Sequence, residues 1–579
     1  MSDLDESIEL DRDALLLRPP GHLYRYKSLN NLALSLQDRF KQGGIMSDLD
    51  QSIELHRDAL LLCPPGHSDR SMSLNNLALS LRDRFMQHGI MSDLDESIKL
   101  HRDALLLRPP AFSLYSQLSQ LSHAASRSDL CVAKSWVAFA DTLDHASALL
   151  AYQTALKFLD QQVALLSSSS HHFDVIREAV FSLATDAFSC SVRHRALMTA
   201  VELVEQGRAV FWTQLACFST PLDELSVSGD TATALADEFR WLSFRLRDAF
   251  DQSTEDQSPQ IRQLTMQWDD VVSRICMLPT FSWFLLPPLF SDLQKAAEDG
   301  PVIIVNASQY RCDALIILSD EDPVHVPIDI TQTEVADLSS EFQSLSKQFG
   351  SLDVQLKLVS ILHKLWHGVI GPVVQALRVS NICRGSRIWW CPTAEFMLLP
   401  LHAAGAYEKK RDSLSHIYIS SYTPTLATLV HARRQVSQDG SPQHFVAIGQ
   451  GHPDGGKPLE CVAPEVAVIA ERLAPVVSSF TRLEDSDATV MGDEKSPDES
   501  IHLAAAMQFS GFRSVIGSMW SVDDEVAQEV VSGFYDNLID DSGRLDCTRA
   551  ATALHNALKK LQRSDIPLEQ QIVFVHLGV

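Results

Sequence analysis

Residues 498–525 read DESIHLAAAMQFSGFRSVIGSMWSVDDE, and this stretch decides the fold of the C-terminal half of the chain. The small and apolar residues of 500–508 predict a helix. The apolar run of 513–520, which follows this helix, predicts a strand. A second helix is expected to begin near Glu525. The order helix, strand, helix is typical of an α/β domain.

The same alternation extends over residues 300–579. Short apolar runs predict a hairpin at 301–318, and helical periodicity follows at 333–377. Further strands are expected at 387–392, 417–420, 445–449, 478–483 and 572–577, and further helices at 465–473, 524–538 and 548–561. Alternating strands and helices predict a mostly parallel sheet with helices on both faces.

Three phrases in this region carry a resemblance to a known family. They are IWWCPTAEFMLLPLHAA at 388–404, the FVAIG strand at 445–449 with the helix after it, and the stretch 498–525. With these phrases, residues 300–579 resemble the CHAT domain, a caspase- and separase-like cysteine peptidase fold that is commonly fused to tetratricopeptide repeats. The resemblance implies an α/β caspase-like domain and, in an intact member, cysteine endopeptidase activity.

The family places its catalytic residues on two neighbouring strands, with a His in a phrase like H-x-A-C-H-G and a Cys in a phrase like L-S-A-C. Neither phrase occurs in this sequence. Between Thr489 and Asp498 stand only the eight residues 490–497, where two strand-plus-helix units of roughly 30 residues each would be needed. A thiol needs an adjacent imidazole for activation. We therefore expect a sheet that lacks about two strands and a chain with no catalytic residue.

Two other Cys–His pairs are candidate replacements for the missing dyad. Cys391 and His402 lie eleven positions apart, but Cys391 ends a predicted buried strand and His402 lies in the following loop, so nothing aligns them. His452 and Cys461 stand on either side of a loop. Neither pair is expected to act as a dyad.

Cofactor and metal sites are also not expected. The Gly-rich loop at 449–458 lacks the Gly-Lys-Ser/Thr ending of a phosphate-binding loop. His171 and His172 have no further ligand at helical spacing.

One remnant of the family's site is a candidate. Trp520 ends the 513–520 strand and Asp523 and Asp524 follow it, and in the family such residues would be expected near the substrate pocket. An Asp there could pair with a basic side chain of a ligand. The structural alternative is that Asp523 or Asp524 caps the next helix.

The N-terminal part of the chain is a repeat. Met1, Met46 and Met91 open the same phrase, which gives a period of 45 residues. Apolar residues at steps of three and four predict two helices per period, and Asp48 is the expected N-cap of one of them. The units resemble the longer variant of tetratricopeptide repeats. We expect such repeats over 1–110 and degenerate helical repeats over 111–295, together an α-helical solenoid.

A solenoid exposes a concave surface that can bind a peptide or a partner helix. The candidate partner-binding residues are Asn30, Asn31, Asn75, Asn76 and Arg82. The alternative is that the repeats are a structural arm that positions the C-terminal domain.

The composition excludes several partners. The formal net charge of −26 disfavours nucleic acid as a partner. No stretch approaches the roughly 20 apolar residues of a membrane helix. The N-terminus has no secretion signal, and the ten cysteines form no C-x-x-C pair, so a cytoplasmic protein with reduced thiols is expected.

Two functions from different classes fit these observations. The first is a non-catalytic scaffold or pseudo-peptidase that binds a protein partner. The second is a caspase-like cysteine endopeptidase, acting in cell death or defence, whose active-site segment is absent from this gene model or splice form.

Overall fold

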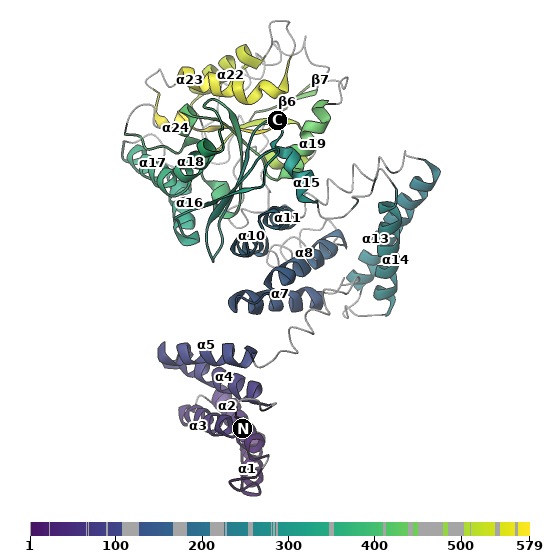
Figure 1. The fold of residues 1–579 in the computed structure, drawn as a ribbon, viewed down its shortest axis with the longest axis vertical. Helices are drawn as coiled ribbons and strands as arrows, with labels where there is room; N and C mark the ends of the chain where they lie inside the picture. The colour runs from purple at the N-terminus through teal and green to yellow at the C-terminus, as the bar shows by residue number, and fades with distance from the viewer. Residues whose placement is uncertain are drawn as a thin grey trace. The chain divides into compact units, whose positions relative to one another are not determined.

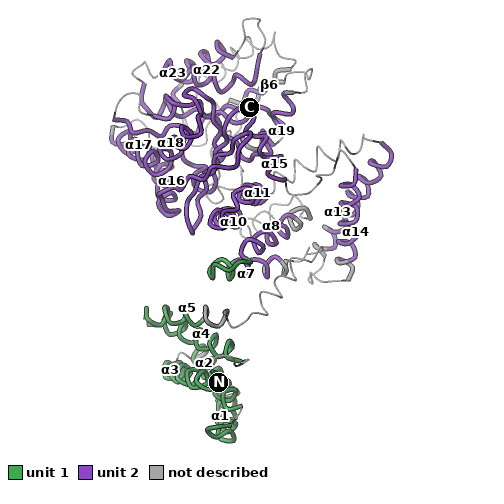
Figure 2. The backbone as a smooth tube through the Cα atoms, viewed as in Figure 1, with its two compact units in different colours: residues 1–121, 138–147 green, residues 122–137, 148–579 purple. Residues whose placement is uncertain are grey.

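The computed structural model describes residues 2–22, 24–43, 45–64, 67, 69–88, 91–106, 127–165, 182–208, 225, 229–252, 259–278, 281, 284, 288–346, 352–408, 413–437, 444–449, 479–484, 503–509, 511–520, 522–538, 545–561 and 566–579. Two compact units divide the chain (Figure 2): residues 1–121 with 138–147, and residues 122–137 with 148–579. The helix α7 (Arg127–Thr142) contributes residues to both units.

The first unit contains helices that follow the 45-residue period. They are α1 (Ser2–Leu16), α2 (Arg25–Gly43), α3 (Met46–Leu61), α4 (Arg70–His88) and α5 (Met91–Leu106). Each helix packs against the next one along the chain. The predicted apolar stripes are buried between them, as Leu49, Ile53, Leu77 and Leu81 illustrate. The two helices expected in each period are therefore present.

The expected role of Asp48 as an N-cap is wrong. The helix α3 already begins at Met46, and the carboxylate of Asp48 is buried and accepts two hydrogen bonds from the Arg39 guanidinium, at 2.7 and 2.9 Å. The equivalent residues one period later, Arg84 and Asp93, make the same two bonds at 2.7 and 3.0 Å. The period thus repeats a buried ion pair between one helix and the next.

The second unit begins with helices and continues into a β-sheet domain (Figure 1). Its first helices are α8 (Ala148–Leu165), α10 (Leu183–Arg193), α11 (Leu197–Gly207), α13 (Asp230–Gln252) and α14 (Pro259–Cys276). The helices α13 and α14 bury a separate apolar cluster that includes Phe239 and Trp268. Two short helices, α15 (Phe290–Leu293) and η1 (Gln294–Ala297), lead into the sheet.

The main sheet has seven strands in the order β3-β2-β1-β4-β5-β9-β8. Their bounds are β1 (Val302–Asn306), β2 (Asp313–Ile317), β3 (Val324–Pro327), β4 (Arg387–Pro392), β5 (Ile419–Tyr422), β8 (Ser514–Ser518) and β9 (Phe574–Gly578). A separate parallel pair consists of β6 (His444–Gly449) and β7 (Ser479–Glu484). The predicted strands are all present within a few residues.

The prediction of a mostly parallel sheet is wrong. In the seven-stranded sheet, β1–β4, β4–β5 and β5–β9 pair in parallel, whereas β1–β2, β2–β3 and β8–β9 are antiparallel. The β8–β9 pair is antiparallel because the chain returns to the end of the sheet at which β8 finished, where Phe574 faces Ser518. The domain is therefore a mixed sheet.

Helices cover both faces of this sheet, as predicted. Alternate residues of a strand point to opposite faces. In β1, Ile303 and Val305 pack with α16 (Gln332–Ser346), α17 (Leu352–Leu365) and α18 (Gly371–Val379). On the other face, Val302 and Ile304 pack with α10, α11 and α19 (Leu426–Ser437). The helices α10 and α11 are thus a layer of the α/β domain.

The remaining elements complete the domain. They are η2 (Trp366–Ile370), η3 (Ala394–Leu398), η4 (Leu401–Ala403), η5 (Leu414–His416), α21 (Leu503–Phe509), α22 (Asp524–Leu538), η6 (Cys547–Arg549), α23 (Ala550–Leu561) and α24 (Leu568–Gln571). The helices α22 and α23 pack against each other around Val530, Phe534 and Leu554. The expected helix at 465–473 lies outside the described residues.

Candidate functional site

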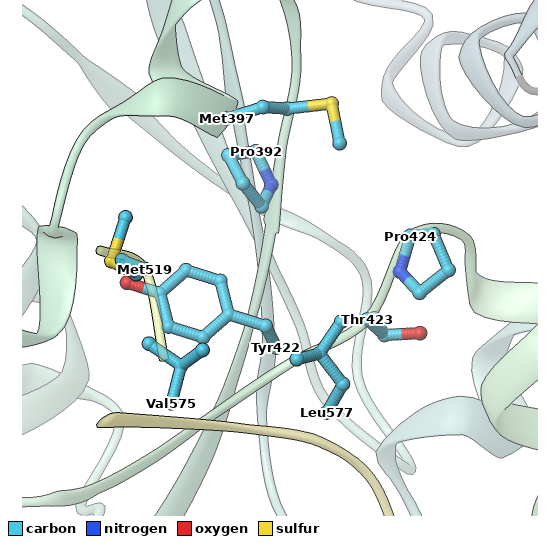
Figure 3. Close-up of a pocket in the computed structure, with 8 residues that line it drawn as sticks. All are labelled: Pro392, Met397, Tyr422, Thr423, Pro424, Met519, Val575 and Leu577. Carbon is cyan, nitrogen blue, oxygen red and sulfur yellow. The ribbon is translucent and has the colours of Figure 1, made fainter. Parts of the chain in front are cut away.

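A small cavity lies beside the ends of the parallel strands β4 and β5 (Figure 3). Its volume is about 40 Å³, which is room for a few water molecules or the tip of one apolar side chain. The residues that line it are Pro392, Met397, Tyr422, Thr423, Pro424, Met519, Val575 and Leu577. Ligands of α/β proteins bind at the carboxyl ends of parallel strands, so this edge is the natural place to look for a site.

Tyr422, which lines the cavity, forms a hydrogen-bonded pair with His402. The Tyr422 hydroxyl lies 2.9 Å from Nδ1 of His402, and the His402 backbone N–H donates to the same hydroxyl at 3.1 Å. Nε2 of His402 lies 2.9 Å from the carbonyl oxygen of Ile572. Because a carbonyl only accepts, Nε2 carries the proton and Nδ1 accepts from Tyr422. Both ring nitrogens are therefore engaged.

Burial keeps this histidine neutral. Removal from water lowers the pKa of His402 to about 4, although its bond to the Ile572 carbonyl favours the protonated form. The Tyr422 hydroxyl is buried as well, which raises its pKa above the ordinary value. At neutral pH the pair is an uncharged hydrogen-bonded unit. It joins the loop after β4 to Ile572, two residues before the start of β9.

The other candidate, Cys391, is the fifth residue of β4 and is fully buried. A guanidinium nitrogen of Arg208 donates to its sulfur at 3.0 Å, and the sulfur lies 3.8 Å from the carbonyl oxygen of Pro424. Burial raises the pKa of the Cys391 thiol to about 11 despite the nearby Arg208 cation. The thiol therefore stays protonated at neutral pH.

Cys391 and His402 do not form a dyad. Cys391 belongs to the apolar cluster that contains α10, α11 and α19, whereas Leu401 and Ala403, which flank His402, belong to the cluster on the other face of the sheet. A catalytic thiol needs a lowered pKa and an imidazole within hydrogen-bond reach. Here the thiol pKa is raised, the imidazole pKa is lowered, and each group is bonded to other partners.

Sequence reasoning missed the buried charges that fix this edge of the sheet. The Glu205 carboxylate accepts hydrogen bonds from the backbone N–H groups of Leu426 and Ala427, at 3.0 and 2.8 Å, at the start of α19. The guanidinium of Arg208, three residues on, donates to the carbonyl oxygen of Pro392. Burial raises the pKa of Glu205, which the N–H groups and Arg208 oppose. From the helical pattern alone, Glu205 and Arg208 are predicted to face solvent.

The residues of the predicted pocket remnant differ in their surroundings: Trp520 is buried and Asp523 is exposed. Trp520 is 6% exposed, and its ring packs edge-on against Phe342 at a centroid distance of 5.4 Å. Its neighbour Met519 lines the cavity. Asp523 is exposed and directly precedes α22, and its carbonyl accepts the hydrogen bond of Ala527 N–H. The Asp524 side chain lies outside the described residues. Trp520 is thus a core residue, and Asp523 is at the helix start that the structural alternative expected.

The residues of the predicted repeat surface also differ in their exposure to solvent. Asn30 is 2% exposed, and its amide bonds to Ser73 at 3.0 Å and to Nδ1 of His56 at 2.9 Å. Its assignment to a binding surface is therefore wrong, because the side chain is sealed between helices. Asn31 is exposed, and Asn75 and Asn76 are half-buried. Arg82 is exposed and pairs with Asp83 at 3.2 Å.

Several sequence predictions fall outside the described residues. They concern His171, His172, His452, Cys461 and the segment between 489 and 498. Within the described part of the chain, no group of three or more His, Cys, Asp or Glu side chains could hold a metal ion. Nor does any helix there have the length and apolar character to cross a membrane.

Comparison with known proteins supports the predicted family. Residues 486–573 match the family model of the CHAT domain. The match confirms the predicted CHAT domain in this part of the chain. No curated protein matches the chain.

Two solved structures of the Saccharomyces cerevisiae separase–securin complex, at 3.0 and 2.6 Å, also match. Each match has 8% identity and covers 96% of this chain. The TM-scores are 0.36 and 0.33, which are too low to establish a shared fold. The chain spans 61% and 54% of the length of the matched chains.

Proposed function

We propose that this chain is a non-catalytic repeat and CHAT-domain protein that binds a protein partner. The observation that carries the proposal is the state of Cys391 and His402 at the carboxyl edge of the sheet. Burial raises the pKa of the Cys391 thiol, which disfavours the thiolate, and lowers the pKa of His402, which disfavours the imidazolium. Each side chain also makes its hydrogen bonds to groups other than its would-be partner. The absence of the family's His and Cys phrases from the sequence supports the same conclusion.

The strand pairing also supports a lost segment. Among the described strands, β6 and β7 pair only with each other and stand apart from the seven-stranded sheet. The sheets are joined in sequence by the stretch from Glu484, the end of β7, to Leu503, the start of α21, which is 503 − 484 − 1 = 18 residues. We infer that two further strands in this stretch would lie between the two sheets.

The repeats are the proposed partner surface. Leu16 and Leu61 occupy the same position in successive periods, at the ends of α1 and α3, and are 78% and 80% exposed. Two large apolar side chains so exposed, at the spacing of the repeat, suit a partner with apolar side chains at a matching spacing. Asn31, Asn76 and Arg82 supply polar groups on the helices α2 and α4. The net charge of −26 favours a protein or peptide over nucleic acid.

The cysteines support a reducing compartment such as the cytoplasm. Among the described residues, Cys63, Cys190, Cys276, Cys312, Cys383, Cys391 and Cys547 are free thiols. Free, mostly buried thiols are typical of proteins kept outside the secretory pathway.

The catalytic part of the proposal is tested with an electrophilic caspase-type probe on the purified chain at pH 7.5. We expect that the probe labels no cysteine whose labelling is blocked by peptide substrates. We also expect that the chain cleaves no member of a peptide library. Labelling that disappears on Cys391→Ala, together with cleavage that His402→Gln abolishes, would refute a non-catalytic role.

The binding part is tested by selecting peptides from a displayed library on the full chain and measuring their Kd by fluorescence anisotropy. The double variant Leu16→Ser/Leu61→Ser should weaken binding at least about ten-fold, as loss of two buried leucines at an interface would. Trp241→Ser, an exposed aromatic residue of α13, is the matched control and should leave the Kd unchanged. Equal loss in both variants contradicts the repeat surface as the site.

The second candidate function is a cysteine endopeptidase whose active-site segment is absent from this sequence. The match to the CHAT domain favours it, because it covers residues 486–573 and so includes the whole segment that follows the junction up to β9. Sequencing the transcript across codons 485–500 separates the two functions. About 60 or more extra codons there, with a His and a Cys, would assign peptidase activity to the natural protein.

A further inference from the structure

Two histidines outside the site described above come together on one helical surface. His363 lies in the last turn of α17, and His367 lies in the wide turn η2 that joins α17 to α18. Their Nε2 atoms are 3.1 Å apart, and their ring centroids are 4.3 Å apart with a tilt of 54°. His363 is half-buried and His367 is exposed. The pair therefore faces solvent with both Nε2 atoms turned toward one point.

The backbone that carries the two rings is held in place by the core. On the opposite side of the same turns, Leu362, Leu365 and Val369 are fully buried in the cluster that covers the sheet. The turn η2 has π-helical hydrogen bonding, which is rare and often accompanies functional sites. Residues four apart on a helix share a face. The spacing of the rings is thus fixed by packed residues and needs little rearrangement to receive a ligand.

The contact between the rings has a specific chemical consequence. Two neutral imidazoles can satisfy an Nε2–Nε2 contact only if one nitrogen donates a proton and the other accepts. If both Nε2 atoms are deprotonated, they present two lone pairs to the same point in space. A cation that replaces the shared proton satisfies both nitrogens at once.

The separation matches the geometry of a chelated metal ion. With metal–nitrogen bonds of about 2.0–2.1 Å, two nitrogens about 3.1 Å apart enclose an angle of roughly 98° at the metal. This value lies between the right angle of square-planar Cu²⁺ or Ni²⁺ and the tetrahedral angle of Zn²⁺. Imidazole is a preferred ligand of all three ions. Hard cations such as Mg²⁺ and Ca²⁺ prefer oxygen and are not expected here.

We propose that His363 and His367 form a bis-histidine site for a divalent transition-metal ion, with Cu²⁺ bound most tightly and Ni²⁺ and Zn²⁺ more weakly. The order follows the general stability order of these ions with nitrogen ligands. The described residues contain no group of three or more metal-ligating side chains. The protein therefore supplies two ligands, and water or an exposed group of a partner completes the coordination. A bound ion would tie α17 to the turn before α18.

The proposal is tested by titrating the full chain with Cu²⁺ in a non-chelating buffer and recording the electron paramagnetic resonance spectrum. The chain has 21 histidines, so the readout is the difference between variants. His363→Gln/His367→Gln should remove one bound Cu²⁺ per chain and the hyperfine pattern of two imidazole nitrogens. Either single variant should weaken that site at least about ten-fold. The control is His431→Gln, an exposed helical histidine paired with Gln435 at i+4, which should retain the site.

A second measurement needs no variant. Carbethoxylation of histidines in the unmodified chain, mapped by mass spectrometry, should fall at His363 and His367 when Cu²⁺ is added and stay constant at His431. Equal Cu²⁺ stoichiometry and affinity in the double variant, or equal modification of the pair with and without Cu²⁺, would overturn the proposal.

Discussion

The guanidinium of Arg208 donates a hydrogen bond to the thiol of Cys391 across 3.0 Å, although 183 residues separate the two in the chain. The same guanidinium donates to the carbonyl of Pro392 and lies 3.6 Å from the sulfur of Met397, beside the cavity. The Arg208 side chain thus occupies part of the carboxyl edge of the sheet. This is the edge at which an α/β domain usually binds its ligand. The helices α10 and α11 and the sheet are therefore expected to fold as one body.

Arg208→Ala should destabilise the second unit by about 3–5 kcal/mol, because it leaves the Pro392 carbonyl and the buried Glu205 carboxylate without their cationic neighbour. Urea unfolding followed by tryptophan fluorescence checks this, since Trp389 and Trp390 are buried in β4. Arg240→Ala is the control, because Arg240 is half-exposed and pairs with the exposed Asp237; it should cost at most about 1 kcal/mol. Similar midpoints for the two variants would show that the Arg208 contacts add no stability.

Alkylation should distinguish the cysteines. Burial holds the pKa of the Cys391 thiol at about 11, so at pH 7.5 it has almost no thiolate and no access to reagent. Cys383 is exposed. We expect iodoacetamide to modify Cys383 within minutes in the native chain and to modify Cys391 only after unfolding. Peptide mapping by mass spectrometry gives both rates, and modification of native Cys391 as fast as Cys383 would contradict the assignment of an inert structural thiol.

The sequence predicted the local elements well and the long-range pairing poorly. The periodicity of 524–538 coincides with α22, and the apolar runs of 301–318 form the expected hairpin of β1 and β2. Periodicity reports which face of a segment is apolar, and that is a local property. It does not report where the chain re-enters a sheet. The helices α22 and α23 were both predicted between β8 and β9, but their periodicity does not show that they return the chain so that Phe574 faces Ser518.

The candidate site could be predicted only in part for the same reason. Asn30 and Asn31 are identical in type and adjacent in sequence, yet only Asn31 faces solvent, because Asn30 lies between the helices that carry His56 and Ser73. Glu205 and Arg208 read as the polar side of a helix, and their partners lie about 200 residues away. A buried polar residue is recognised only when its distant partner is known.

Lower pH should destabilise the fold through His402. Burial lowers its folded-state pKa to about 4, below the unfolded value of about 6.5. The unfolded chain therefore binds a proton between these values that the folded chain does not, and stability falls as the pH drops from about 6.5 to 4. For this residue the loss reaches about 3 kcal/mol. Urea unfolding at pH 7 and pH 4.5 should show a smaller pH effect in His402→Gln than in the wild type; an unchanged pH effect would mean that His402 titrates normally.

In the repeats, the neighbouring residues Asn30 and Asn31 provide a test variant and its control. Asn30→Ala removes two buried hydrogen bonds, so the ring of His56 and the hydroxyl of Ser73 lose a partner inside the helix stack. Each buried polar group left without a bond costs about 1–3 kcal/mol. Asn31→Ala changes an exposed side chain and should stay within about 0.5 kcal/mol of the wild type. Hydrogen exchange of the α2–α4 amides, measured by mass spectrometry on the full chain, reports these local free energies. Protection should fall about ten-fold or more in Asn30→Ala and hardly at all in Asn31→Ala; the reverse order would mean that Asn30 faces solvent and is free to meet a partner.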